Sequence, residues 1–149
     1  MFDIMIVLAA FVSMEMVAWL AHKYIMHGIG WFLHQDHHKK ESEGFFEKND
    51  SFFLIFALPG ILCFFFGAQQ GFNYLFWIGL GITLYGLAYF LVHDIFIHQR
   101  FSLFRNADSF YLKAIRRAHK MHHKHLGKHN GESFGMLWVS FRYFRDALK

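Results

Sequence analysis

The chain has 149 residues, of which 55% are hydrophobic and 17% charged, with a formal net charge of +4. This length suffices for one domain but not for two, so we expect a single membrane-embedded domain over residues 1–149. The apolar share exceeds that of ordinary globular proteins, and the single cysteine excludes internal disulfides and any cysteine-based zinc or iron–sulfur site.

Three apolar segments occupy the first two thirds of the chain, at residues 2–21, 52–67 and 72–92. At about 1.5 Å of rise per residue, the first and third can cross a hydrocarbon core of roughly 30 Å. The second is short and needs its flanks or a locally thinned bilayer. Residues 68–71 predict a tight turn, and hence an antiparallel helical hairpin. We therefore expect an all-α membrane protein with about three transmembrane helices.

The basic residues indicate how these segments lie in the membrane. All fifteen fall between the first and second segments or after the third. With three spans, these regions share one side, which the positive-inside rule makes cytoplasmic, with the N-terminus outside. The first segment lacks the basic start of a signal peptide and contains Glu15, so we expect it to be retained as a span. Topology thus accounts for the positive charge, and we expect no nucleic acid partner.

Beyond the third segment the chain is polar but keeps helical patterns. Asp108 and Ser109 predict a helix cap. One face of the helix that follows is expected to carry Tyr111, Ile115, Ala118, His119 and His122. A second amphipathic helix is predicted at residues 133–148. Both patterns are typical of helices that lie at the cytoplasmic membrane surface.

The chain contains twelve histidines, more than folding alone would require. Ten of the twelve histidines fall into two H-x4-H motifs and two H-x2-H-H motifs, which alternate along the chain. The motif residues are His22 and His27, then His34, His37 and His38, then His93 and His98, then His119, His122 and His123. His125 and His129 lie outside the pattern, and we interpret them as surface residues.

The spacing within these motifs indicates metal coordination. Positions i, i+3 and i+4 share one helix face, so each H-x2-H-H motif is expected to present three imidazoles to one metal ion. Positions i and i+5 lie about 140° apart on an α-helix, so an H-x4-H pair would divide between two ions, or close on one ion where the helix ends. Gly28 and Gly30 suggest such an end after His27. All four motifs are expected to meet at the cytoplasmic ends of the spans.

The number and type of ligands favour iron. Ten imidazoles exceed the ligands of one ion, and two six-coordinate ions leave roughly two positions for oxygen species or water. A structural zinc site has four ligands and no open position. The chain also lacks both the Glu-x-x-His pairs of carboxylate di-iron centres and the H-E-x-x-H motif. We therefore predict two iron ions that react with O₂, although zinc could replace iron on purification.

Other classes of histidine-rich protein fit less well. A metal-trafficking tract normally occupies one flexible loop, whereas these motifs extend over some hundred residues. A bis-histidine haem protein would explain pairs of histidines but not triplets. A membrane metal transporter needs several polar residues inside the spans, whereas Glu15 is the only charged one we find away from their ends.

Three carboxylates are candidates to support the ligands. Asp36 and Asp94 could accept the second N–H of ligand imidazoles, although a plain surface role fits them as well. Glu15 lies seven residues before His22, and intramembrane carboxylates are costly and usually functional. It is expected to orient a ligand through water or to line the substrate path, the alternative being simple burial between helices by a hydrogen bond. Apolar aromatic residues could line a substrate cavity or merely face lipid, namely Phe52, Phe53, Phe56, Phe64, Phe65, Phe66, Trp77, Tyr85 and Tyr89.

The chain resembles the bacterial β-carotene 3-hydroxylases, within the membrane fatty-acid hydroxylase and sterol desaturase superfamily. The four histidine motifs carry the likeness to the superfamily. The closer likeness is carried by residues 15–26 (EMVAWLAHKYIM), 45–59 (FFEKNDSFFLIFALP), 89–100 (YFLVHDIFIHQR), 114–123 (AIRRAHKMHH) and 133–135 (SFG). The region around His125 and His129 departs from the family pattern, which keeps these two out of the ligand set.

This resemblance implies O₂-dependent hydroxylation at C3 of a β-ionone ring, which takes β-carotene through β-cryptoxanthin to zeaxanthin. The ten motif histidines would act through the metals. It also implies a bacterial inner-membrane protein that takes its carotenoid from the lipid bilayer and its electrons from ferredoxin and NAD(P)H. The chain has no Gly-rich dinucleotide motif, so reducing power is expected from a partner. The alternatives are a fatty-acid or sterol hydroxylase or desaturase of the same superfamily and, remotely, a metal transporter.

Overall fold

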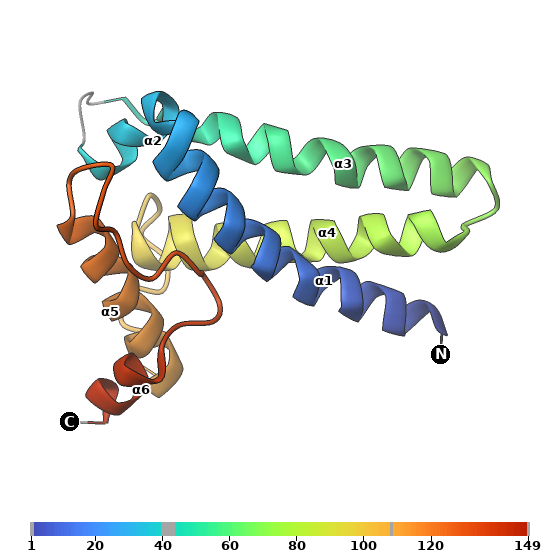
Figure 1. Ribbon diagram of the computed structural model, residues 1–149. Coiled ribbons are helices and arrows are strands. Elements are labelled where there is room, and N and C mark those ends of the chain that lie inside the picture. Colours follow the sequence, from blue (N-terminus) through green and yellow to red (C-terminus); the bar gives the residue numbers. More distant parts are fainter. Residues whose placement is uncertain (1, 40–43, 108, 149) are drawn as a thin grey trace.

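The computed structural model describes residues 2–39, 44–107 and 109–148 (Figure 1). Within these residues there are helices and connecting loops but no strands, which confirms the all-α prediction. The helices are α1 (Phe2–Leu20), η1 (Ala21–Ile29), α2 (Trp31–His38), α3 (Asp50–Gln69), α4 (Tyr74–Phe90), η2 (Leu91–Ile97), α5 (Phe110–Lys124) and α6 (Phe141–Ala147).

In the described part of the chain, three continuous helical stretches are long and apolar enough to cross a membrane. They are Phe2–Ile29, Asp50–Gln69 and Tyr74–Ile97. The large apolar side chains of the first and second stretches are mostly exposed, as expected where lipid rather than protein covers them, whereas most of those in the third are half-buried. The predicted number of spans is confirmed. The second span includes two flanking residues at each end, and its 20 residues reach about 30 Å, so no thinning of the bilayer is needed.

The predicted hairpin is formed by α3 and α4, and α1 packs along α4 (Figure 1). A Cβ added at Gly67 would lie 2.2 Å from the backbone nitrogen of Phe76, so glycine permits the close approach of α3 to α4. The turn comes slightly later than the predicted residues 68–71, because α3 continues to Gln69. Gly71 adopts a positive φ of 76°, and the Asn73 side chain then caps α4.

The first and third spans each end in a π-helix. In η1 the Gly30 N–H donates to the carbonyl of Ile25 (2.8 Å), and at the end of η2 the His98 N–H donates to the carbonyl of His93 (2.9 Å). These bonds join residues five apart, which is the π-helical pattern. The backbone leaves helical geometry at Gly28 (φ −110°, ψ −118°), so the predicted helix end near Gly28 and Gly30 is present.

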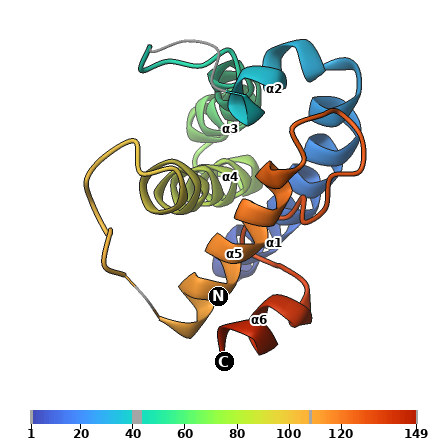
Figure 2. The same cartoon turned by 90° about the vertical axis from the view of Figure 1, so that its left-hand side faces the viewer.

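The remaining elements gather at one end of the three long helices. Figure 2 looks at the molecule from this end, with α2, α5 and α6 toward the viewer. Helix α5 begins at the predicted cap, where the Ser109 hydroxyl accepts from the Leu112 N–H (3.3 Å); Asp108 lies outside the described residues. The predicted inner face of α5 is buried at Ile115, Ala118, His119 and His122, whereas Tyr111 is 41% exposed.

The predicted helix over residues 133–148 is wrong in its first half, since only Phe141–Ala147 is helical. Residues 125–139, here called the strap, run without regular structure from the end of α5 across α1 to α6 (Figure 1). Positive φ angles at Asn130 (65°) and Ser133 (58°) interrupt helical geometry in the strap. Its backbone groups bind side chains of other elements instead of each other, as described below.

Candidate metal centre

The structure brings the histidine motifs together at the end of the molecule where α2 and α5 lie. In the described residues their ring nitrogens form two groups, each with one nitrogen per residue within 4.8 Å of all others in the group. The first cluster contains His22, His27, His34, His38 and His122, and the second cluster contains His37, His93, His98 and His119. His123 packs beside the second cluster, with its ring centroid 4.5 Å from that of His119.

Each H-x2-H-H motif divides between the two clusters, which corrects the expectation that its three imidazoles serve one metal. On α2, His34 and His38 face the first cluster, whereas His37 belongs to the second. On α5 the pattern is reversed, because His122 belongs to the first cluster and His119 to the second. Positions i and i+4 are about 40° apart around an α-helix, and i+3 lies about 60° to the other side. A helix that runs between two sites can therefore serve both.

Each H-x4-H motif stays within one cluster. His22 and His27 both lie in the first cluster, with ring centroids 5.3 Å apart, and His93 and His98 lie in the second, 4.5 Å apart. Of the two predicted arrangements, closure on one position where the helix ends is the one found. The reason is local: a π-helix bonds residue i to i+5 and so brings positions i and i+5 near the same face.

The hydrogen bonds of the first cluster determine which nitrogen of each ring carries the proton. Every Nδ1 in the cluster lies against an oxygen acceptor. These pairs are His22 with Phe134 O (3.0 Å), His27 with Lys128 O (3.0 Å), His34 with Asn49 Oδ1 (2.7 Å), His38 with His125 O (3.0 Å) and His122 with Glu132 O (2.8 Å). Carbonyl oxygens only accept, so each Nδ1 donates and each Nε2 presents a lone pair.

These lone pairs converge. The Nε2 atom of His34 lies 3.1 Å from that of His22 and 3.2 Å from that of His38, and His122 lies 3.1 Å from His38 in the same way. Two unprotonated nitrogens have no proton to share, so they repel at this distance unless a cation lies between them. With metal–nitrogen bonds of about 2.0–2.1 Å, neighbouring ligands at right angles would be about 2.9 Å apart, close to the observed separations. The first cluster therefore fits a metal ion.

The second cluster is oriented by carboxylates. The Nδ1 of His37 lies 2.7 Å from Glu47 Oε2, and that of His93 lies 3.2 Å from Asp94 Oδ2. The Nε2 atoms of His37 and His93 are 3.0 Å apart, and those of His98 and His119 are 2.9 Å apart. Among the described residues, His119 Nδ1 and His123 Nε2 are buried without a hydrogen-bond partner. Convergent nitrogens and an unpartnered ring nitrogen again fit a metal ion.

One guanidinium holds these carboxylates in place. Arg100 makes a bidentate contact with Asp50 (2.8 and 3.1 Å), and its side chain also lies 3.1 Å from Glu47 Oε2 and 3.1 Å from Asp94 Oδ1. The network links the start of α3 to the end of η2. Sequence reasoning missed Glu47, Asn49 and Arg100, whose only signal was their place in the segments that resemble the family.

The three predicted supporting carboxylates have different surroundings. Asp94 lies beside the Nδ1 of His93. Asp36 instead accepts the Lys48 N–H (2.6 Å), and its other oxygen is buried without a partner in the described structure. Glu15 accepts from the hydroxyl of Tyr85 (2.8 Å) and from backbone N–H groups of the strap. His125 contributes its backbone carbonyl to the first cluster, and the His129 side chain is exposed.

Burial keeps the imidazoles neutral. Together with charge on the neighbouring rings, it lowers the pKa of His38 to about 4, that of His122 to about 3 and that of His34 to about 2. The pKa values of His37 and His119 are also lowered well below the usual value, mainly by burial. A neutral imidazole is the form that binds a metal, so the site is ready to do so at neutral pH.

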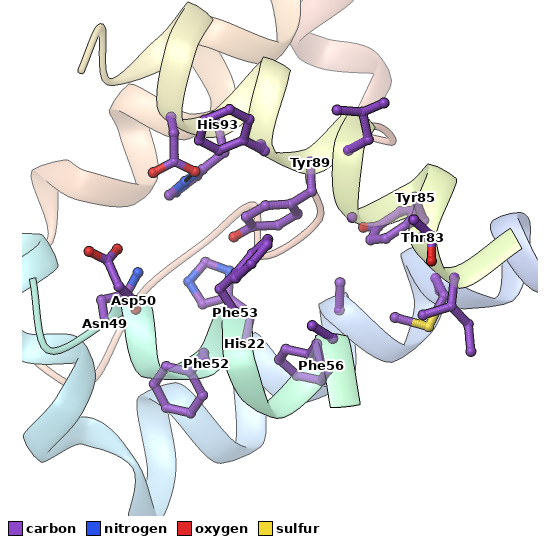
Figure 3. A pocket seen from close by; sticks show the side chains of 18 of the residues that line it. His22, Asn49, Asp50, Phe52, Phe53, Phe56, Thr83, Tyr85, Tyr89 and His93 are labelled. Atoms are coloured by element: carbon purple, nitrogen blue, oxygen red, sulfur yellow. Dashed lines mark hydrogen bonds and ion pairs between the residues drawn. The ribbon is translucent and has the colours of Figure 1, made fainter. Parts of the chain in front are cut away.

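An apolar cavity of about 470 Å³ lies between α1, α3 and α4 and reaches both clusters (Figure 3). His22 of the first cluster and His93 of the second line it at the end nearest the metal positions. Tyr89 also lines it, with its ring centroid 4.9 Å from that of His93. Of the aromatic residues proposed from the sequence, the cavity is lined by Phe52, Phe53, Phe56, Tyr85 and Tyr89. Such a cavity suits an elongated apolar substrate that enters from lipid.

Comparisons with known proteins agree with this geometry. The family model described as fatty acid hydroxylase matches residues 7–142. The chain is 45% identical over 135 residues to a β-carotene hydroxylase of Pantoea ananas, which covers 91% of this chain and 76% of the relative. It is 37% identical over 140 residues to a β-carotene hydroxylase of Paracoccus sp. (strain PC1), covering 93% and 85%.

A plant relative shares the same region. The chain is 40% identical over 131 residues to the chloroplastic β-carotene 3-hydroxylase 1 of Arabidopsis thaliana, covering 86% of this chain and 41% of the longer plant protein. No solved structure matches the chain. The matched region includes all four histidine motifs and the apolar spans between them.

Proposed function

The chain belongs to the fatty acid hydroxylase family, and from this premise we propose that it is a non-haem di-iron monooxygenase that hydroxylates carotenoids. The reaction is hydroxylation at C3 of a β-ionone ring, which takes β-carotene through β-cryptoxanthin to zeaxanthin. The names of its bacterial and plant relatives support this substrate. The structural observation that carries the proposal is an apolar cavity that opens onto two clusters of convergent imidazoles.

The ten motif histidines are proposed as the ligands of two iron ions, with His123 completing the second cluster. When bound, iron supplies the redox chemistry with O₂ that side chains alone cannot. In the overall reaction one oxygen atom enters the ring C–H bond and the other leaves as water, which consumes two electrons and two protons. Because the chain has no dinucleotide motif, these electrons come from outside, and we propose reduced ferredoxin supplied by NAD(P)H as their source.

The protein itself binds and orients the substrate. The walls of the cavity around Phe53 and Phe56 are apolar, so they receive a hydrocarbon ring and exclude water. His22 and His93 fix the depth at which the ring meets the clusters. A carotenoid with two like ends can react at one end, leave, and return reversed, which accounts for the sequence from β-carotene to zeaxanthin.

The protein is proposed to lie in the bacterial inner membrane with the clusters on the cytoplasmic side and the N-terminus outside. All fifteen basic residues fall in segments that three spans place on one side, the side of the clusters. Single cysteines at Gln70 and at His129, in a Cys63→Ser background, test this topology. A membrane-impermeant thiol reagent added to intact spheroplasts is expected to label the first position and not the second; the opposite pattern would contradict the proposed orientation.

Expression in cells that accumulate β-carotene tests the reaction. Chromatography is expected to show β-cryptoxanthin and zeaxanthin, and a His37→Ala variant is expected to form neither. Unchanged β-carotene together with newly hydroxylated fatty acids or sterols would move the assignment to another substrate of the same family. Metal flux into vesicles without oxygen consumption would instead support a transporter.

A further inference from the structure

The strap is the element that orients the first cluster. Its backbone carbonyls at residues 125, 128, 132 and 134 accept the Nδ1–H groups of His38, His27, His122 and His22, respectively. Four of the five rings are thus held by one irregular segment. The orientation of a ligand ring depends on such outer partners, and their loss typically weakens metal binding about 10- to 100-fold.

The strap has no helical hydrogen bonds of its own to fix its position, and a carboxylate from the first span holds it instead. Glu15 Oε1 accepts the backbone N–H groups of Met136 (2.9 Å), Leu137 (3.0 Å) and Trp138 (2.9 Å). Carboxylate oxygens are strong acceptors for backbone N–H groups. Three consecutive amides on one carboxylate oxygen fix the path of the strap directly after Phe134, whose carbonyl binds His22.

The backbone around the carboxylate is shaped for this contact. A Cβ added at Gly135 would lie 3.0 Å from Glu15 Oε1 and 2.5 Å from the carbonyl oxygen of Trp138, so only glycine leaves room there. The fourth partner, the Tyr85 hydroxyl, donates to Oε2 (2.8 Å) from α4. The second cluster makes none of these bonds, and its His37 and His93 rings are oriented from other elements by Glu47 and Asp94, which Arg100 holds.

We propose that Glu15 is a positioning residue for the first metal position alone. By accepting the N–H groups of Met136, Leu137 and Trp138, its carboxylate fixes the position of the strap. The carbonyl groups of the strap in turn orient the rings of His22, His27, His38 and His122. Glu15 acts through the backbone of the strap and does not contact metal or substrate. This inference rests on the proposed two-metal centre, and it explains why a carboxylate is kept inside the first span.

The test counts Fe²⁺ bound to each cluster in the detergent-solubilised full chain, loaded without oxygen. The unaltered protein is expected to hold two ions, and Glu15→Gln is expected to hold one at Fe²⁺ concentrations that saturate the unaltered protein. Gly135→Ala disturbs the same contact from the other side and is expected to show the same loss. In both variants the affinity of the first cluster is expected to fall about 10- to 100-fold.

Two histidine backgrounds assign the loss to a cluster. With the second cluster disabled by His93→Ala and His119→Ala, Glu15→Gln is expected to remove the remaining ion. With the first cluster disabled by His34→Ala and His122→Ala, it is expected to leave the remaining ion in place. If the unaltered protein bound no iron, the proposed two-metal centre itself would be wrong. That result differs from one in which the unaltered protein and Glu15→Gln both bind two ions, which would contradict only the role of Glu15.

A packing variant away from the strap controls for general destabilisation. A Cβ at Gly60 would lie 3.1 Å from Ile82 Cγ2, between α3 and α4, so Gly60→Ala is expected to lower thermal stability and keep two ions. Selective loss of the first ion in Glu15→Gln and Gly135→Ala supports the proposal. Retention of both ions, equal loss from both clusters, or the same loss in Gly60→Ala overturns it.

Discussion

Residue by residue, the two clusters differ in the group that accepts the Nδ1–H of each ring. In the first cluster the acceptors are neutral carbonyl oxygens, such as that of Glu132 for His122. In the second cluster they include carboxylate oxygens, such as that of Glu47 for His37. A carboxylate partner raises the basicity of an imidazole more than a carbonyl does. The second cluster is therefore expected to bind its metal more tightly and to fill first.

Two glutamates allow this difference to be tested. Glu47→Gln removes the charge beside His37 and is expected to weaken metal binding at the second cluster about 10- to 100-fold, measured by competition with a chelator. Glu132→Gln is a matched control, because only the backbone carbonyl of Glu132 orients His122 while its side chain pairs with Arg142 and Tyr143. Equal affinities for the two variants would contradict the role given to the Glu47 carboxylate.

Gly86 provides a probe of the substrate cavity. It lines the cavity, and a Cβ at this position would meet nothing within 4 Å. Gly86→Phe is expected to fill part of the space and lower the rate of zeaxanthin formation at least about tenfold, a loss of about 1.4 kcal/mol in transition-state binding, while the bound iron is unchanged. Leu84→Phe, on the exposed side of the same helix, is expected to leave the rate near that of the unaltered protein. Similar rates in both variants would mean that the substrate binds elsewhere.

Among the elements, the π-helices decide how the long spans contribute to the metal centre. An α-helix would separate His22 from His27 by about 140°, and η1 removes that separation by widening the turn. The same device in η2 serves His93 and His98. The spans thus place paired histidines at their ends, while α2 and α5 lie between the clusters and divide their histidines between them.

The α3–α4 hairpin supports these ends, and Gly67 is a point of close approach between its helices. A side chain at this position would collide with backbone atoms of Phe76 rather than with a movable side chain. Gly67→Ala is expected to destabilise the protein by about 1–3 kcal/mol, as overpacking does elsewhere, and to lower its thermal unfolding midpoint. Gly86→Ala adds a methyl group to α4 at a position where no other atom lies within 4 Å. It is expected to leave the unfolding midpoint unchanged or slightly raised. A Gly67→Ala midpoint as high as that of Gly86→Ala would contradict this packing.

At the scale of the whole molecule, the clusters join parts of the chain that are far apart in sequence. The first cluster alone unites η1, α2 and α5, and carbonyl groups of the strap accept from four of its five rings. Bound metal would therefore stabilise the arrangement of these elements as well as take part in chemistry, because a ligand that binds only the folded state shifts the folding equilibrium.

Removal of the metals is expected to make stability sensitive to acid. Burial lowers the pKa of His38 to about 4 and that of His122 to about 3, whereas both titrate near 6.5 when unfolded. Below about pH 6.5 the unfolded chain therefore binds more protons than the folded chain, so the free energy of unfolding decreases as the pH is lowered. Chelator-treated protein is expected to unfold at a lower temperature at pH 5.5 than at pH 7.5. Equal midpoints would contradict neutral, buried imidazoles.

Sequence alone determined the properties that depend on nearby residues. Hydrophobic runs predicted the three spans, because length and composition decide whether a helix can cross a bilayer. The motif spacings singled out the ten histidines. Tertiary structure decided how they are divided between the clusters. His34 and His38 belong to the first cluster and His37 to the second, because α2 lies between the two sites. It also decided that Glu15 clasps the strap, although 121 residues separate it from Met136. Such pairings follow from how distant elements pack, which no local pattern records.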